Sequence, residues 1–301
     1  MTHTSKTIVF FGTDEFSAVS LRELIERGFT IGAVVTKPDS RKGRGRELQA
    51  SLVKQIALEN SIPVWQPLKM SEIAESIEAL TEAADEKPTG VLVSYGKIIP
   101  QAIIDLFEPG IINVHPSLLP KYRGPSPIES AILHGDTETG VSIMQLSAAM
   151  DAGPVYKQVF FSLDDTETAP DLEAKLAALG AQELVTILPS IMNGSLQPQA
   201  QDDSLASYCK LLSKDDSVLN PETLTAEQAE RRVRAYVAYP KTKVTIAGHL
   251  VVITKAHLAS ENSTVLDIQC SDGRFLSIDE LIGPSGRAMN AKAFLNGYAA
   301  G

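Results

Sequence analysis

The sequence predicts an α/β fold in which a doubly wound, mostly parallel sheet is followed by a small C-terminal β-barrel. Apolar runs of strand length alternate with helical patterns over roughly the first 200 residues, as in sheets built from strand–helix–strand units. Beyond residue 213 the runs become short and β-like, and glycines or polar turns separate them. We therefore expect an N-terminal domain at residues 1–194, a linker at 195–213 and a C-terminal barrel domain at 214–301.

The elements of the N-terminal part follow from hydrophobic periodicity. Strand-like runs are expected at residues 6–12, 29–36, 63–65, 90–96, 111–115, 139–146 and 155–163. Helical patterns are expected at residues 14–28, 48–58, 71–84, 100–107, 126–134 and 168–193. Proline opens two of these helices, Ser71 is a plausible cap of a third, and the longest is expected to break near Gly180. Residues 37–46 are expected to form a loop.

The C-terminal part opens and closes with helical patterns, at residues 225–236 and 290–298. Strand-like runs lie between them at residues 243–246, 250–256, 264–268 and 274–278. Several short strands at such close spacing favour a small barrel.

Composition excludes several classes of protein. A net charge of −10 over 301 residues argues against broad nucleic-acid binding. No apolar run approaches the ~20 residues of a membrane span. Two isolated thiols, Cys209 and Cys270, form neither a disulfide framework nor a zinc site. The N-terminal residues lack a signal-peptide layout, so we expect a cytoplasmic protein without membrane contact. We also expect the protein to be a monomer.

Residues 37–46, the basic stretch, depart from this acidic character, because Asp39 is their only acid before Glu47. The basic residues of this stretch are Lys37, Arg41, Lys42, Arg44 and Arg46. Concentrated positive charge of this kind neutralises phosphates, although a solvated charged loop is the commoner fate of such runs. Basic residues of the C-terminal part form a second, weaker candidate, namely Arg231, Arg232, Arg234, Lys241 and Lys243.

The first strand-to-helix turn contains a single glycine, Gly12, where a dinucleotide fingerprint has three. The chain also lacks the Gly-x-x-x-x-Gly-Lys-Ser/Thr loop of nucleotide hydrolases. Nicotinamide binding and P-loop hydrolysis are therefore disfavoured.

Asn113 and His115 end the strand-like run at residues 111–115. Residues two apart on a strand point to the same face, so both side chains project together from the end of that strand. The following residues 116–120 begin and end with proline, which disfavours continuation of the strand. A strand that ends in two polar groups before a rigid loop is typical of a site at the carboxyl edge of an α/β sheet.

Asp151 adds a third polar group, in the turn after the strand at residues 139–146. Taken alone, it is most simply explained as a turn aspartate. Together the three residues suit acyl transfer to an amine: His115 polarises a carbonyl or moves a proton, Asp151 orients His115, and Asn113 donates to an oxyanion. Ser117 has no second histidine to activate it, so direct transfer between two bound substrates is favoured over a covalent intermediate.

These motifs, in this order, resemble the folate-dependent formyltransferase family. The resemblance rests on Asn113–Pro120, Tyr122–Gly124, Gly140–Met144 and Asp151–Gly153. It continues over the whole chain, through Phe11–Thr13, Val35–Asp39, residues 43–46, Pro63–Pro67, Gly283–Met289 and Phe294–Gly297. It implies a Rossmann-like formyltransferase catalytic domain and an OB-like C-terminal domain that contacts tRNA.

The resemblance also implies a reaction, in which the formyl group of 10-formyltetrahydrofolate passes to the α-amine of methionine on initiator tRNA. In this family the matching residues Asn113, His115 and Asp151 are the catalytic set, and no metal takes part. The residues implied to line the folate site are Ser117, Leu118, Leu119 and Pro120. The basic stretch, with Arg44 as the matching arginine, is implied to contact the acceptor arm of the tRNA.

Four alternatives stay open at this level. A sibling enzyme would formylate an amino sugar on a nucleotide, but a small acceptor does not need the basic stretch. Glycinamide ribonucleotide formyltransferases are shorter and leave the C-terminal third unexplained. A non-catalytic binding protein or a nicotinamide-dependent oxidoreductase would share only the scaffold, and scaffold alone does not fix function.

Overall fold

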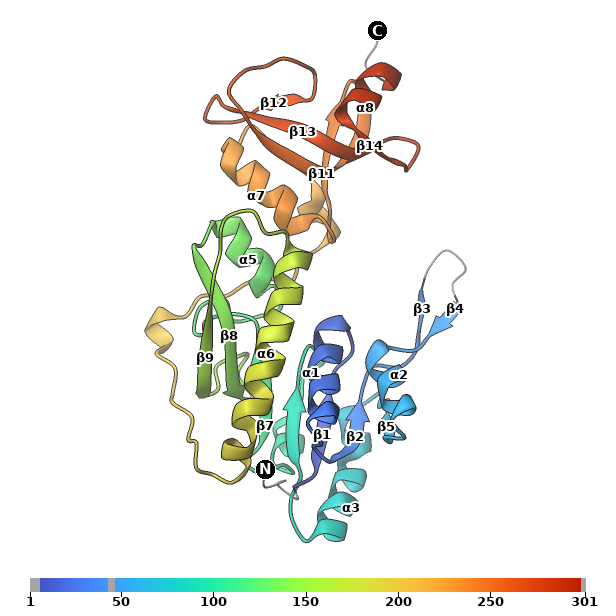
Figure 1. Ribbon diagram of the computed structural model, residues 1–301, viewed down its shortest axis with the longest axis vertical. Coiled ribbons are helices and arrows are strands. Elements are labelled where there is room, and N and C mark those ends of the chain that lie inside the picture. The colour runs from blue at the N-terminus through green and yellow to red at the C-terminus, as the bar shows by residue number, and fades with distance from the viewer. Residues whose placement is uncertain (1–5, 43–46, 299–301) are drawn as a thin grey trace. The chain divides into compact units, whose positions relative to one another are not determined.

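The computed structural model describes residues 6–42 and 47–298 of the chain, and these residues form two compact units (Figure 1). The first unit contains the residues up to 123 together with 140–161 and 173–208. The second contains residues 124–139, 162–172 and those from 209 onward. Each unit combines segments that are distant in sequence, whereas the sequence-based domains were continuous ranges. The expected domain boundaries therefore stay predictions.

A seven-stranded sheet forms the centre of the first unit, with the strand order β5-β2-β1-β6-β7-β8-β9. The strands are β1 (Ile8–Phe11), β2 (Ile31–Val35), β5 (Val64–Trp65), β6 (Thr89–Leu92), β7 (Ile111–His115), β8 (Glu138–Gln145) and β9 (Val155–Ser162). The five strands from β5 to β7 pair in parallel, and β8 runs antiparallel to β7. From β1 the chain adds β2 and then β5 toward one edge of the sheet, and it then adds β6 and β7 on the opposite side of β1. This arrangement confirms the doubly wound, mostly parallel sheet.

The helices that connect these strands match the expected pattern at most positions. They are α1 (Glu15–Glu26), α2 (Leu52–Glu59), α3 (Ala74–Ala84), α4 (Gln101–Ile104) and α6 (Ala169–Met192). Short 3-10 helices lie at Met70–Ile73 and Asp203–Leu205. The expectation that Ser71 caps a helix is wrong, because Ser71 lies inside the first of these 3-10 turns. Glu72 instead accepts hydrogen bonds from the main-chain N–H groups of Leu68 and Lys69.

One face of the sheet packs on α3 and α4. Val9, Phe11 and Val35 of the sheet form a buried cluster with residues of these helices, and Ile111 of β7 belongs to the same cluster. Side chains alternate between faces along a strand, so Asn113 and His115 lie on the same face as Ile111. The apolar part of β7 thus anchors the strand, and its last residues carry polar groups beyond the core.

Helix α6 packs on the opposite face of β7, and it runs without a break through Gly180. The break expected there is wrong for a reason that the sequence does not show. A Cβ atom at position 180 would lie 2.7 Å from Cγ1 of Val114 and 3.2 Å from Cγ1 of Val141. The glycine is therefore needed for the close approach of helix and sheet, and it does not end the helix.

The basic stretch is not the plain loop that the sequence suggested. Strand β3 (Ser40–Lys42) pairs antiparallel with β4 (Glu47–Gln49), so the described part contains two short paired strands. Arg44 and Arg46 lie outside the described residues.

The second unit contains a curled antiparallel sheet, which confirms the small β-barrel class. Its strands are β10 (Thr242–Ile246), β11 (His249–Ala259), β12 (Asp267–Gln269), β13 (Phe275–Ile282) and β14 (Ala288–Asn290). Its helices are α5 (Pro127–His134), α7 (Ala226–Tyr236) and α8 (Ala291–Tyr298), with a 3-10 turn at Lys214–Ser217. The strand order is β10-β11-β13-β12, and β14 pairs with β13.

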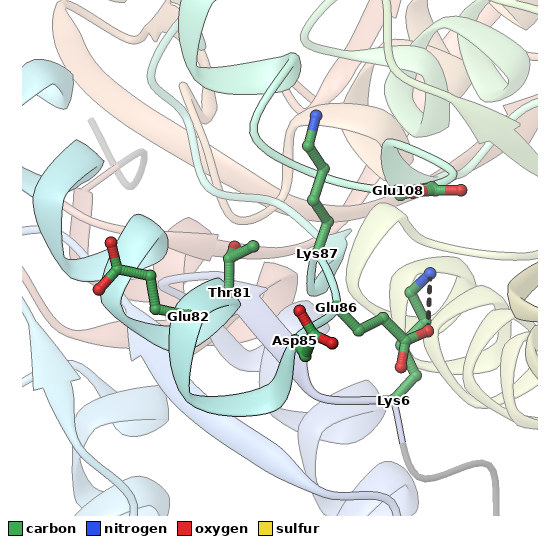
Figure 2. Close-up of a pocket in the computed structure, with 7 residues that line it drawn as sticks. All are labelled: Lys6, Thr81, Glu82, Asp85, Glu86, Lys87 and Glu108. Carbon is green, nitrogen blue, oxygen red and sulfur yellow. Dashed lines mark ion pairs between the residues drawn. The ribbon is translucent and has the colours of Figure 1, made fainter.

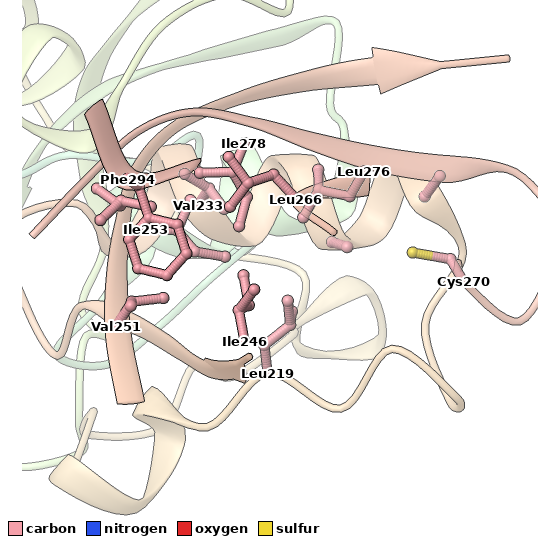
Figure 3. Close-up of a cluster of buried hydrophobic side chains, with 13 residues drawn as sticks. Leu219, Val233, Ile246, Val251, Ile253, Leu266, Cys270, Leu276, Ile278 and Phe294 are labelled. Atoms are coloured by element: carbon pink, nitrogen blue, oxygen red, sulfur yellow. The ribbon is translucent and has the colours of Figure 1, made fainter. Parts of the chain in front are cut away.

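The core of this sheet is dense and apolar, as Figure 3 shows. Val251 and Ile253 of β11, Leu276 and Ile278 of β13, and Phe294 of α8 are among its buried side chains. Burial of each such side chain contributes about 1.5–3 kcal/mol. Within the part of the chain that the structure describes, no helix has both the length and the apolar character to cross a membrane.

Candidate active site

His115 ends β7, and the loop that follows holds its ring. The ring Nε2 lies 3.0 Å from the main-chain oxygen of Tyr122, and a carbonyl oxygen only accepts, so Nε2 carries the hydrogen. The other nitrogen, Nδ1, is therefore the one available for chemistry. His115 is only 5% exposed, so groups that meet it interact in an environment less polar than water.

Asp151 faces that second nitrogen. Its Oδ1 lies 3.9 Å from Nδ1 of His115, which is an ion-pair separation and longer than a hydrogen bond. The structure thus brings together two residues that are distant in sequence. Asp151 lies in the turn between β8 and β9 with a φ of +48°, a left-handed conformation that aspartate tolerates better than most residues.

Gly153 explains the shape of this turn. A Cβ atom at position 153 would lie 1.9 Å from the main-chain oxygen of Gln145, at the end of β8. Only glycine permits this contact without a shift of the backbone. The close approach folds the turn against the end of β8 and so fixes where Asp151 emerges.

Asn113 lies two residues before His115 on the same face of β7. Its main chain is paired in register with Leu92 of β6 and with Met144 of β8. The residue is 6% exposed, and its side-chain amide forms no hydrogen bond with any residue that the structure describes. Neither amide atom of Asn113 is among the buried, unpartnered side-chain atoms of the described residues, so the amide remains accessible. A ligand at this end of β7 could therefore accept a hydrogen bond from it.

The loop from Ser117 to Pro120, expected to line the folate site, is held by a hydrogen-bond network. The Oγ of Ser142, on β8, donates to the main-chain oxygen of Ser117 at 2.7 Å and accepts from the N–H of Leu119 at 3.0 Å. The amide of Gln158, on β9, donates to the main-chain oxygen of Leu119 at 2.7 Å and to Ser142 Oγ at 3.0 Å.

This network determines what the loop can offer a ligand. Ser117 and Leu119 are buried, and the hydroxyl of Ser117 donates to the main-chain oxygen of Lys121 at 2.6 Å. The side chains of Leu118 and Pro120 are half-buried. A ligand at this loop would therefore meet the side chains of Leu118 and Pro120 more readily than those of Ser117 and Leu119.

One hydrogen-bonded cluster holds the residues of the basic stretch that precede β3. Nζ of Lys54 lies 2.8 Å from Oδ2 of Asp39, and the amide of Gln66 donates to Asp39 Oδ1 and to the main-chain oxygen of Lys37, each at 2.8 Å. The pKa of the Asp39 carboxyl is lowered, mainly by the hydrogen bond from Lys54 and to a smaller extent by the one from Gln66. The one acid of the stretch before Glu47 is thus paired with a cation outside the stretch. Arg41, on β3, is exposed, Lys37 is half-buried, and Lys42 ends β3.

The arginines of α7 are engaged within the second unit. Arg234 is buried and pairs with Glu230 at 2.8 Å and with Asp165 at 2.7 Å. Arg231 also pairs with Asp165, at 3.2 Å. Arg232 donates to the main-chain oxygens of Asp216 and Val218. These contacts favour a structural role for the three arginines over the weaker expectation of an RNA track.

Sequence reasoning missed a second cluster at the carboxyl edge of the sheet. The order of the strands reverses between β1 and β6, and ligands of doubly wound sheets bind at such a switch point. There Thr13 donates to the main-chain oxygen of Tyr95 at 3.2 Å, and the hydroxyl of Ser94 contacts the carboxylate of Asp14. Ser94 has a φ of +45°. The strand order would have pointed to these residues, but one sequence does not reveal that order.

Two cavities lie away from this edge. Figure 2 shows a cavity of about 490 Å³, lined by Lys6, Thr81, Glu82, Asp85, Glu86, Lys87 and Glu108. Because Lys6 and Lys87 precede β1 and β6, this cavity lies at the amino ends of the parallel strands. A second cavity, of about 410 Å³, includes Gly110, which precedes β7. Neither cavity includes Asn113, His115 or Asp151.

Comparisons with known proteins agree with this fold. Residues 5–188 match the family model described as formyl transferase, and residues 211–299 match the formyl transferase C-terminal domain. A methionyl-tRNA formyltransferase from Stutzerimonas stutzeri (strain A1501) is 39% identical, over 94% of this chain and 91% of that protein. One from Methylococcus capsulatus (strain ATCC 33009 / NCIMB 11132 / Bath) is 38% identical, over 97% of each chain.

Solved structures show the same fold at lower identity. The sugar 3N-formyl transferase WlaRD, solved in the presence of dTDP and 5-N-formyl-THF, has a TM-score of 0.68 at 22% identity, over 91% of this chain and 97% of that one. An N-formyltransferase from Helicobacter canadensis, in complex with folinic acid and dTDP-3-aminofucose, has a TM-score of 0.69 at 20% identity, over 91% and 99%. At these identities the likeness concerns the fold alone.

Proposed function

Because the chain belongs to the methionyl-tRNA formyltransferase family, we propose that it transfers the formyl group of 10-formyltetrahydrofolate to the α-amine of methionine on initiator tRNA. The reaction is direct acyl transfer. The amine nitrogen bonds to the formyl carbon, and the formyl oxygen becomes an oxyanion as a tetrahedral centre forms. The bond from carbon to N10 of the folate then breaks, the amine loses a proton, and N10 gains one.

The observation that carries this assignment is the separation of 3.9 Å between His115 Nδ1 and Asp151 Oδ1, together with an Asn113 amide that no described residue binds. In the imidazolium form of His115, Nε2–H stays on the Tyr122 oxygen, and Nδ1–H donates to the oxyanion. The Asn113 amide supplies a second donor to that oxygen. The carboxylate of Asp151 accepts the proton that leaves the amine. Donors placed where charge develops usually lower the barrier of such a reaction more than any other single effect.

The loop from Ser117 to Pro120 adjoins His115 and would bind the folate. The network from Ser142 and Gln158 supports this role, because it fixes the loop before a ligand arrives. A loop fixed in this way loses less conformational entropy on binding than a mobile one.

The basic stretch would bind the phosphates of the tRNA, with Lys37, Arg41, Lys42, Arg44 and Arg46 as candidates. The pairing of Asp39 with Lys54 supports this proposal, because it leaves the positive charge of the stretch uncancelled. That the protein acts as a monomer stays a prediction.

The test is a formylation assay with 10-formyltetrahydrofolate and two acceptors, charged initiator methionyl-tRNA and an amino sugar on a nucleotide. We expect formylation of the aminoacyl-tRNA and at least 100-fold lower kcat/KM with the sugar. The reverse order would contradict the proposal and would favour the sibling activity.

A further inference from the structure

We propose that Gln201, held by Arg123, is a positioning residue that sets Asp151 against His115. The inference rests on the proposed function, since it concerns the geometry of the same site. Gln201 follows α6, in the segment expected to be a linker, and neither composition nor spacing marks it as part of a site.

The side-chain amide of Gln201 is saturated with hydrogen bonds. Its NH2 group donates to the main-chain oxygen of Asp151 at 2.8 Å and to that of Gly153 at 2.7 Å. Its oxygen accepts from Arg123 Nε at 3.1 Å and from Nη2 at 2.8 Å. Both hydrogens and both lone pairs are used, and the opposite orientation of the amide would set its NH2 group against the guanidinium. The amide of Gln201 therefore has one orientation, in which its NH2 group binds the Asp151 turn.

Arg123 fixes the amide in turn. Only 2% of Arg123 is exposed, and its Nη2 lies 2.6 Å from Oδ1 of Asp203. Its Nη1 donates to the hydroxyl of Tyr208 at 3.2 Å. A buried cation is stable only when its hydrogen bonds are satisfied, and a planar guanidinium presents its donors at fixed angles. Arg123 thus acts as a rigid support for Gln201.

The same segment also reaches His115. Tyr122 precedes Arg123, and its main-chain oxygen is the acceptor for His115 Nε2. The N–H groups of Tyr122 and Arg123 donate to the side chain and the main chain of Ser207, at 2.9 and 2.8 Å. Residues 122–123 therefore hold the imidazole through one carbonyl and the Asp151 turn through Gln201. One connected unit sets both sides of the pair that lies 3.9 Å apart.

Gln199 gives this support its own anchor. Its main chain exchanges two hydrogen bonds with Val155 at the start of β9, at 2.7 and 2.8 Å. The segment is thus fixed to the sheet two residues before Gln201. Because misplacement of a reacting group by about 1 Å can cost 100-fold in rate, loss of the Gln201 contacts should slow the chemical step and leave substrate binding unchanged.

The test is Gln201→Glu, which keeps an acceptor for Arg123 and removes both donors to the Asp151 turn. We expect kcat for methionyl-tRNA formylation to fall by about 10- to 100-fold, with KM for both substrates changed less than about 2-fold. The matched control is Gln197→Glu, four residues earlier. Gln197 is exposed, and its amide donates to the main-chain oxygen of Gly194. The control should keep wild-type kcat.

A second background, Asp151→Asn, distinguishes a positioning role of Gln201 from a merely structural one. The measured quantity is the effect of Gln201→Glu on kcat in each background. If Gln201 acts through Asp151, Gln201→Glu lowers kcat strongly in the wild type and less than about 2-fold in Asp151→Asn, because the two effects do not add. Equal losses in both backgrounds would overturn the inference. So would a fall in Tm that accounts for the lost activity, or wild-type kcat in Gln201→Glu.

The wild-type assay separates the two proposals. A wild-type protein that does not formylate methionyl-tRNA refutes the proposed function, and this inference with it. An active wild type together with an equally active Gln201→Glu refutes the inference alone.

Discussion

Asn113 has a side-chain amide that no described residue binds and that is not closed off from solvent, so it is available to donate to a ligand. We expect Asn113→Ala to lower kcat by about 10²–10³, the usual cost of one oxyanion donor. Since no side-chain hydrogen bond within the described residues is lost, Tm should change little. Steady-state kinetics and thermal unfolding of the purified variant measure both effects.

Asn60→Ala is the matched control for this truncation. The amide of Asn60 donates to the main-chain oxygen of Ile56 at 2.8 Å, at the end of α2. This control should lose some stability and keep wild-type kcat. The opposite pattern, in which Asn113→Ala loses stability and keeps its activity, would make Asn113 a structural residue.

Glu129 in α5 gives a prediction for pH. Burial raises the pKa of its carboxyl, and a hydrogen bond with the main chain at the start of the helix opposes this only in part. A raised pKa means that the folded state binds the proton more tightly than the unfolded state. Stability from this group is therefore complete at low pH and is lost as pH rises through the raised pKa.

We expect Glu129→Gln to raise Tm at pH 7, by an amount that shrinks toward zero as pH falls below the ordinary carboxyl range. Thermal unfolding between pH 4 and pH 8 measures the difference from the wild type. Glu138→Gln, at the exposed start of β8, serves as the control. A Tm difference for Glu129→Gln that stays constant over this range would contradict the prediction.

Among the elements, α6 shows how packing overrides helix propensity. In an isolated helix Gly180→Ala would be favourable by about 1 kcal/mol. Here the added methyl meets Val114, a stiff β-branched residue of β7, at 2.7 Å. Overpacking of this kind costs about 1–3 kcal/mol, so we expect net destabilisation. The strain falls on the strand that carries Asn113 and His115, so kcat should fall as well.

Gly297→Ala is the opposite case within α8. A Cβ atom at position 297 would meet nothing within 4 Å. This substitution should stabilise the protein by about 0.5–1 kcal/mol. Chemical denaturation of both variants measures the change in the free energy of unfolding, which we expect to be a loss for Gly180→Ala and a gain for Gly297→Ala. A stabilised Gly180→Ala would show that α6 and the sheet can move apart without cost.

The strands were predictable because their burial appears directly in the sequence. The strand-like run at residues 111–115, which begins with apolar residues, indicated β7. The runs of the C-terminal part indicated the curled sheet, although β12 (Asp267–Gln269) lies later than the expected run at 264–268. Helix interruptions were not predictable in the same way. Gly180 has its reason in contacts with Val114 and Val141, which are distant in sequence.

Over the whole molecule, the residues proposed to take part in the reaction were easier to predict than the residues that position them. Asn113 and His115 share a strand, so their common face follows from the period of a strand alone. Their assignment as catalytic residues stays a prediction. Gln201 could not be found, because its role depends on the path by which the segment after α6 returns to the Asp151 turn. Such a return path is a property of the tertiary fold.

The charge distribution gives a prediction for the whole protein. Net charge is −10, yet five basic residues gather within residues 37–46, and the one acid among them is paired with Lys54. If each of the five neutralises one phosphate, log(kcat/KM) for the tRNA should fall with log[salt] with a slope no steeper than about −4.5. The arginines of α7 are engaged in their own unit and should add nothing to this slope.

Arg41→Ala tests the source of that slope, because Arg41 is exposed on β3. The variant should raise KM for the tRNA, reduce the salt slope by about 1 and leave kcat unchanged. Arg22→Ala, in which an exposed arginine of α1 is removed, should keep the wild-type slope and so show that the loss of one charge elsewhere is not enough. A wild-type slope well beyond about −4.5, or an Arg41→Ala slope equal to the wild type, would place the phosphate contacts outside the basic stretch.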